Sequence, residues 1–263
     1  MAGIEGEGSS EMEYTEIQTT ADCLDSCIIF HTVNDVVGFV LYMHQQIPST
    51  LQDISMEFDT LQAEYKELER ALTEPEVKAS CRRKHTSKMR DINLGIRRFG
   101  KFMNTVSNLQ TALKLMISQI PSIEEVILIL GASPLRPLHV YKLCFSHGTA
   151  IFKDSDDFAK SKAAEGLSRK AIRTLISKGA GCGSYPGPTK LFLLIKAPSS
   201  CNLSLHFLPK RDFKYSKKIL PFRLLFRCRN QDQEMIIPTS DDLIWFQCRH
   251  VIKGVTFNTT REE

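Results

Sequence analysis

Apolar residues recur at helical spacing near the middle of the chain, between Asp91 and Pro121. Spacings of three, four and seven place them on one side of a helix, which we expect to lie across a sheet or another helix. Arg97, Arg98 and Lys101 fall on the opposite side and are expected to face water. Pro121 ends the pattern. The apolar positions are Ile92, Ile96, Phe99, Met103, Val106, Leu109, Leu113, Met116 and Ile120.

Two further helical segments precede this one. Apolar residues from about Asp25 onward predict a helix that stops near Pro48, and a polar, weakly helical segment follows from Leu51 to about Thr73. The segment CRRKHTSKMR, at 81–90, is interpreted as a basic connection. Residues 1–25 are acidic and begin with a stretch rich in Gly, Ser, Glu and Thr, which predicts a disordered N-terminal tail.

The second half of the chain is dominated by strand patterns. The run VILILG (126–131) is too short for a typical helix and indicates a buried strand, followed by a turn at 133–137 and an alternating strand at 139–145. A helix is expected from about 156 to 178, with Ser155 or Asp156 as its N-cap. Helices early and strands late predict one α+β domain. The remaining strands are expected at 190–196, 203–208, 219–227, 234–238, 243–248 and 251–257.

The cysteines do not follow the spacing of a metal site. The chain has eight, but the close pair Cys23 and Cys27 has no second pair downstream. The N-terminus lacks the basic and apolar regions of a secretory signal. We therefore expect reduced, mostly buried thiols in a cytosolic or nuclear protein. No apolar stretch is expected to approach the about 18 residues of a membrane-spanning helix.

The net charge of +4 is unevenly distributed. Residues 1–65 hold 12 acidic residues and no Lys or Arg, so the rest of the chain carries +16. This asymmetry indicates either an acidic tail over a basic body or a charged partner surface.

Motifs of catalysis do not occur in the chain. There is no GxSxG, HExxH or paired CxxC. The glycine-rich segment 179–190 departs from the phosphate-loop spacing and is interpreted as a loop between a helix and a strand. The acidic run 154–157 fits a helix start better than a Mg²⁺ site. We expect neither a catalytic residue, nor a metal, nor a cofactor.

Two basic clusters, at 82–90 and 210–218, raise the alternative of nucleic-acid binding. Phe213 and Tyr215 interleave with the second cluster, as in grooves that stack single-stranded bases. Solvated loops are the favoured interpretation of both clusters, and nucleic acid is the less favoured partner.

The predicted helix at 156–178 carries two apolar strips. One strip has the spacing of a core face, and the other, Ile172 and Ile176, lies beside Arg169 and Arg173. An exposed apolar strip rimmed by arginine is typical of a protein-binding face, and a wide core face is the alternative. The residues of the core-facing strip are Ala164, Leu167, Ala171 and Leu175.

Four blocks of the sequence resemble the comet family of HORMA-like adaptors, in the same order. They are YMHQQIP (42–48), VILILGASPLRPLHVYKL (126–143), HFLPKRDFKY (206–215) and DDLIWFQCRHVIKGVTF (241–257). The resemblance implies a HORMA-like domain over 26–257 and a C-terminal tail at 258–263. The implied α+β fold is a central, mostly antiparallel β-sheet backed by three helices, with a C-terminal safety-belt segment.

Members of this family are non-enzymatic adaptors. They bind the closed form of the mitotic checkpoint protein Mad-two and present it to a hexameric AAA+ ATPase of the TRIP-thirteen type, which opens it. The mitotic checkpoint complex is thereby disassembled and the spindle assembly checkpoint is silenced. The resemblance implies the same partners here, no membrane, and a location in the nucleus, the cytoplasm and the mitotic spindle.

The resemblance also assigns residues to each partner. Pro209 and Lys210 match the pair that contacts the ATPase. Met43 stands where the family has glutamine, and a methionine can fill an irregular groove. Ile172 stands where the family has phenylalanine, and this departure keeps an apolar side chain. The residues implied to bind closed Mad-two are Met43, Arg169, Ile172, Arg173 and Ile176.

One related function stays open from the sequence. A HORMA protein can also capture a peptide beneath a mobile safety belt of its own. Binding of such a peptide would raise the stability of the protein.

Overall fold

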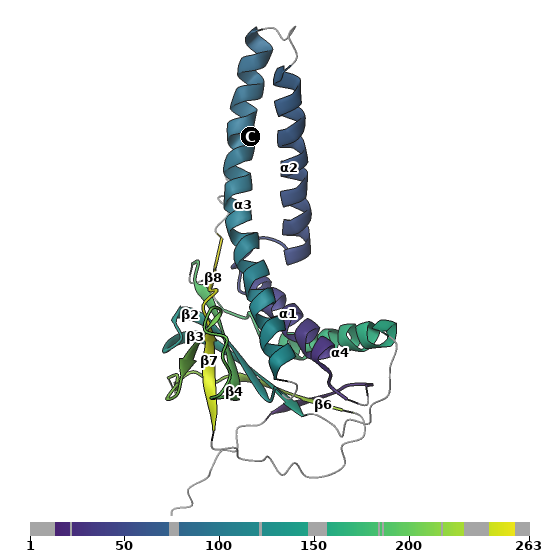
Figure 1. Cartoon of the computed structure of the whole chain (residues 1–263), viewed down its shortest axis with the longest axis vertical. Helices are drawn as coiled ribbons and strands as arrows, with labels where there is room; N and C mark the ends of the chain where they lie inside the picture. The colour runs from purple at the N-terminus through teal and green to yellow at the C-terminus, as the bar shows by residue number, and fades with distance from the viewer. Residues whose placement is uncertain are drawn as a thin grey trace, which may run out of the picture.

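The computed structural model describes residues 14–21, 23–73, 79–120, 123–146, 157–183, 185, 187–216, 218–228 and 242–255. Figure 1 shows a β-sheet with helices on one side and two helices that project from it as an arm. The helices are α1 (Ser26–Met43), α2 (Leu51–Thr73), α3 (Ala79–Gln119) and α4 (Asp157–Ser177). The strands are β1 (Thr15–Gln18), β2 (Glu125–Ser133), β3 (Arg136–Ser146), β4 (Lys190–Pro198), β5 (Phe207–Lys210), β6 (Phe222–Arg227), β7 (Leu243–Cys248) and β8 (Ile252–Lys253).

The eight strands form one mixed sheet in the order β1-β6-β3-β2-β4-β7-β5, with β8 paired to β4. The pairs β1·β6 and β3·β6 are parallel, and the other pairs are antiparallel. The expected α+β class and the mostly antiparallel sheet are therefore confirmed. The described residues form four helices, one for each helical segment expected from the sequence. Helices α1, α3 and α4 lie against the sheet, and α2 packs on α3 in the arm (Figure 1).

The apolar run of β2 is explained by burial on both faces of the sheet. Alternate residues point to opposite faces. Val126, Leu128 and Leu130 pack in the main core with α1, α3 and α4, whereas Ile127 and Ile129 face a second cluster that includes Trp245, Phe213 and Tyr215. Because both faces are covered, the strand shows no polar alternation.

Helix α1 is the central helix of the core. Asp25 caps its N-terminus by accepting a hydrogen bond from the Ile28 amide at 2.8 Å. By length and composition this helix is apolar enough to cross a membrane, so the expectation that no stretch approaches that length is wrong for Ser26–Met43. Eight of its residues are buried within the protein, and this packing accounts for its apolar character.

Helix α2 and the N-terminal half of α3 form the projecting arm (Figure 1). The basic segment 81–90 belongs to α3, so its interpretation as a connection, with a helix starting near Asp91, is wrong. The polar segment 81–90 is stabilised as a helix by packing against α2. A Cβ added to Gly95 would lie 3.2 Å from Leu61 of α2, and Lys88 pairs with Glu64 at 2.5 Å.

Several predicted boundaries also need correction. Residues 15–18 form β1 in parallel with β6, so the tail does not extend as disorder to residue 25. The strand expected at 203–208 begins only at Phe207, because the amides of His206 and Phe207 donate to the Leu203 carbonyl in a turn. Of the strand expected at 251–257, only Ile252–Lys253 form a strand (β8) within the described residues 251–255, and 256–257 lie outside the described residues. Residues 155–156 and 234–238 lie outside the described residues.

Candidate interaction surface at the ends of helices α1 and α4

Helices α1 and α4 pack against each other and end at the same corner of the protein. Met43 is the last residue of α1, and Gly181 follows the end of α4. A Cβ added to Gly181 would lie 3.1 Å from the Cβ, Cε and carbonyl oxygen of Met43, and the glycine has a φ of +84°. Only glycine combines that φ with such a close approach without strain. The structure thus brings Met43 to the C-terminal end of α4.

The two apolar strips of α4 differ in exposure. The core-facing strip is buried as predicted. Ile172 is half-buried, and Ile176 is 51% exposed. Arg169 and Arg173 are exposed beside them, and Arg169 forms an ion pair with Glu165 one turn earlier. The second strip is therefore accessible at the surface, and the alternative of a wide core face does not hold for Ile176. We call Met43, Ile172, Ile176 and the two arginines the α1–α4 surface.

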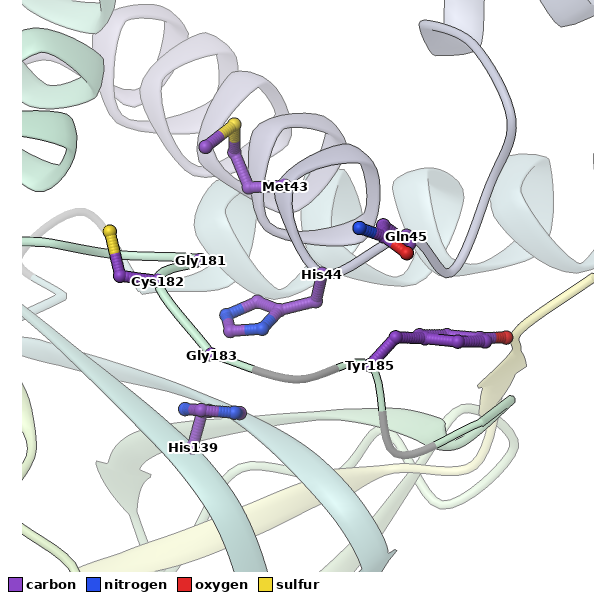
Figure 2. Close-up of a pocket in the computed structure, with 8 residues that line it drawn as sticks. All are labelled: Met43, His44, Gln45, His139, Gly181, Cys182, Gly183 and Tyr185. Carbon is purple, nitrogen blue, oxygen red and sulfur yellow. The ribbon is translucent and has the colours of Figure 1, made fainter.

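A small pocket lies at this corner, between the end of α1 and the loop after α4 (Figure 2). Its cavity volume is about 20 Å³, which is room for about one water molecule. Pockets for small-molecule ligands are usually about 300–1,000 Å³. The pocket at this corner is therefore too small for a small-molecule ligand of the usual size. Its lining includes Met43, His44, His139, Gly181, Cys182 and Tyr185.

Below Met43, two histidines and a tyrosine join α1 to strand β3. His44 shares a hydrogen bond of 2.5 Å with the hydroxyl of the fully buried Tyr141, and its ring centroid lies 4.1 Å from that of His139. Burial, with the neighbouring His139 as the second cause, lowers the pKa of His44 to about 4. Burial also lowers the pKa of His139 and raises that of Tyr141. The cluster is held neutral at physiological pH.

The stability of the protein is expected to fall as the pH drops from about 6.5 toward 4. The unfolded chain takes up a proton on His44 at its ordinary pKa of 6.5, whereas the folded protein takes it up only near 4, so protons favour unfolding in this window. The stability that comes from keeping His44 neutral is fully present above pH 6.5, the pKa of the unfolded chain. It is lost as the pH falls toward 4, the pKa in the folded protein. Thermal melts across the window should show a falling Tm, with a shallower fall for His44→Gln. His31→Gln, at an exposed position of α1, should keep the wild-type dependence of Tm on pH. If Tm falls equally with pH in all three proteins, His44 is not the cause of the fall.

Gln46 fixes this corner to the loop before β4 and to the chain after β8. Its side-chain amide donates to the carbonyls of His44, at 2.8 Å, and Gly187, at 3.3 Å, and its oxygen accepts from the Thr189 amide at 2.6 Å. Its backbone carbonyl accepts from the Val255 amide at 2.8 Å. The residue is 1% exposed. The bonds to Gly187, Thr189 and Val255 join distant parts of the chain and fix the end of α1, which carries Met43, in place.

Pro209 and Lys210 lie on a different part of the sheet. They end β5, the edge strand, which pairs with β7, and both residues are exposed. Proline is tolerated on an edge strand because no further strand needs the N–H donor that proline lacks. The residues implied for the two partners therefore occupy separate elements.

The aromatic residues near the second basic cluster have a structural role. Phe213 and Tyr215 are partly buried against the sheet, and the Phe213 ring lies 6.1 Å from that of Trp245. Their packing accounts for the interleaving that indicated a base-stacking groove. No pattern in the sequence indicated the cluster of His44, His139 and Tyr141, because His44 and Tyr141 are 97 positions apart in the sequence.

The described residues contain no group of three or more His, Cys, Asp or Glu side chains placed to hold a metal ion. No protein-family model matches the chain, and no curated protein matches it.

Proposed function

We propose that this protein is a non-enzymatic adaptor that binds the closed form of Mad-two and presents it to an AAA+ ATPase of the TRIP-thirteen type. The observation that carries the proposal is the exposed Ile176 beside Arg173 on α4, at the corner where α1 ends with Met43. These are residues that the family resemblance assigns to the partner. The resulting opening of Mad-two would disassemble the mitotic checkpoint complex.

The packing beneath the α1–α4 surface supports a conformer-selective contact. Ala171 and Leu175 are fully buried on the adjacent, core-facing side of α4, so the helix is fixed on the core. A rigid apolar face rimmed by arginine loses little conformational entropy on binding and resembles the centre of a protein interface. An adaptor shifts its partner toward the closed form only by contacting that form better than the open one.

The separate position of Pro209 and Lys210 supports simultaneous contact with the ATPase. The pair lies on edge strand β5 and the α1–α4 surface lies on helices, so the two partners would contact different residues of the adaptor. The adaptor itself performs no chemistry. It positions closed Mad-two so that the ATPase can engage it.

The proposal is tested by reconstituting the opening reaction. Closed Mad-two, the ATPase and ATP are mixed with and without this protein, and conversion to the open form is followed by ion-exchange chromatography. The adaptor should accelerate the conversion. An unchanged rate, with the ATPase shown to be active, would refute the presentation step.

Lys210→Glu should reduce the rate of this conversion by at least about tenfold while leaving the affinity for closed Mad-two unchanged. Reversing an exposed charge at a contact replaces attraction by repulsion, an effect of about 1.4 kcal/mol or more for tenfold. Lys214→Glu is the matched control, because Lys214 is an exposed lysine in the loop that follows β5. Normal conversion by the Lys210 variant would show that this lysine does not contact the ATPase.

A further inference from the structure

A basic stripe runs along the exposed side of the arm helix α3. Arg83, Arg90 and Arg97 are spaced seven residues apart, which is about two helical turns, so they lie on one face. Lys101 continues this face and Leu94 lies within it, 65% exposed. At a rise of about 1.5 Å per residue, the stripe from Arg83 to Lys101 is about 27 Å long.

Nearly all the charged residues of this region are positive. Residues 79–101 hold eight lysines and arginines against one aspartate, a net charge of +7. Lys88, which pairs with Glu64 at 2.5 Å, is turned toward α2. Within the described part of the chain, no acidic side chain lies within ion-pair distance of Arg83, Arg90, Arg97 or Lys101. The stripe therefore presents its positive charge to solvent.

The stripe leads into a cleft at the foot of the arm, between α3 and β8. The cavity has a volume of about 420 Å³. Its lining combines cations with apolar side chains, and Lys253 adds to the two cations that α3 supplies. The residues that define this character are Arg98, Lys101, Lys253, Phe102, Val251 and Val255.

We propose that the stripe and the cleft bind an acidic peptide segment of a partner protein, with an apolar residue of that segment seated in the cleft. The positive charge attracts an anionic ligand. The apolar cleft wall and the exposed Leu94 favour a peptide over a phosphate backbone, which offers no apolar group of this kind. Phe102, the aromatic residue of the cleft, is 5% exposed and so presents little surface for base stacking. This binding site is separate from the α1–α4 surface and does not depend on the proposed function.

The test uses fluorescence anisotropy with a labelled peptide of glutamate and aspartate that carries interspersed leucines. About nine residues suffice, since an extended chain covers about 3.3 Å per residue. The chain of 263 residues should bind this peptide, with an affinity that falls as salt is added. Arg90→Glu combined with Arg97→Glu should weaken binding by at least about tenfold. Leu94→Ser, or a leucine-free peptide, should also weaken it.

The control is a second double charge reversal, Lys162→Glu with Lys214→Glu, at exposed positions on α4 and in the loop after β5. Circular dichroism should show all variants folded. Equal weakening by the two double variants would overturn the proposal, as would failure of the wild-type protein to bind the peptide. Tighter binding of a duplex RNA that is insensitive to Leu94→Ser would assign the stripe to nucleic acid instead. Binding that occurs only after residues 256–263 are deleted would assign it to the chain's own end.

Discussion

Ile176→Asp should abolish binding of closed Mad-two. The side chain is 51% exposed in the free protein, and the proposed contact would bury it against an apolar groove. An aspartate there would remove the apolar side chain that fills the groove and would bring a charge into an apolar contact, so the affinity should fall by at least about 100-fold, or about 2.7 kcal/mol. The variant should remain folded, because the position contributes little to the core. An acidic residue near the end of a helix costs only about 0.3–1 kcal/mol.

Ile172→Asp is expected to lose binding as well, but with an added loss of stability, since Ile172 is half-buried. Ile176 is therefore the cleaner position. Leu220→Asp is the matched control, because Leu220 is an 80% exposed apolar residue on a different part of the surface. Isothermal titration calorimetry measures the affinities, and circular dichroism checks the fold. If Ile176→Asp binds as tightly as the control, the apolar strip of α4 is not part of the interface.

Gln46→Ala should destabilise the protein by about 2–4 kcal/mol. The substitution leaves the Thr189 amide and the carbonyls of His44 and Gly187 without the amide group that now pairs with them. Each buried polar group left without a partner costs about 1–3 kcal/mol, reduced where water can enter. The loss should be visible in urea denaturation as a lower midpoint with an unchanged slope.

The control for this substitution is Gln52→Ala. Gln52 is an exposed residue of α2, and its replacement should change the free energy of unfolding by no more than about 0.5 kcal/mol. If Gln46→Ala costs no more than Gln52→Ala, the hydrogen bonds of Gln46 do not hold the corner together. If Gln46→Ala loses binding of closed Mad-two at a temperature where it stays folded, the hydrogen bonds of Gln46 are needed to position the α1–α4 surface.

Several elements were predictable from the sequence, most of them from strong local signals and α2 from a weak one. The expected segment Leu51–Thr73 coincides with α2, whose first turn is capped by Thr50 through the Asp53 amide at 3.2 Å. The buried strip of α4 and the apolar run of β2 were also predictable, because periodicity reports directly which side chains are buried.

Elements stabilised by distant partners were not predictable in the same way. The first three turns of α3 have the polar composition of a loop, and their helical form depends on contacts with α2 such as Lys88–Glu64. Strand β1 has four residues in an acidic segment, and its pairing with β6 joins residues about 200 positions apart. Local pattern carries no information about such contacts.

The candidate surface was predictable in part. The spacing of Ile172 and Ile176 beside two arginines indicated a second strip on α4, but its exposure depends on where the other elements lie. The approach of Met43 to Gly181 depends on how α1 and α4 pack, and a φ of +84° is a property of the folded chain. The basic stripe of α3 emerged only once residues 81–90 proved to be helical.

The most direct measurement is co-elution of this protein on a sizing column with Mad-two locked in the closed form and, separately, in the open form. The α1–α4 surface is proposed to recognise the closed form, so a stable complex should elute with closed Mad-two and none with open Mad-two. Ile176→Asp should remove that complex. Failure to co-elute with the closed form, or equal co-elution with both forms, would contradict the proposal that this protein is a conformer-selective adaptor.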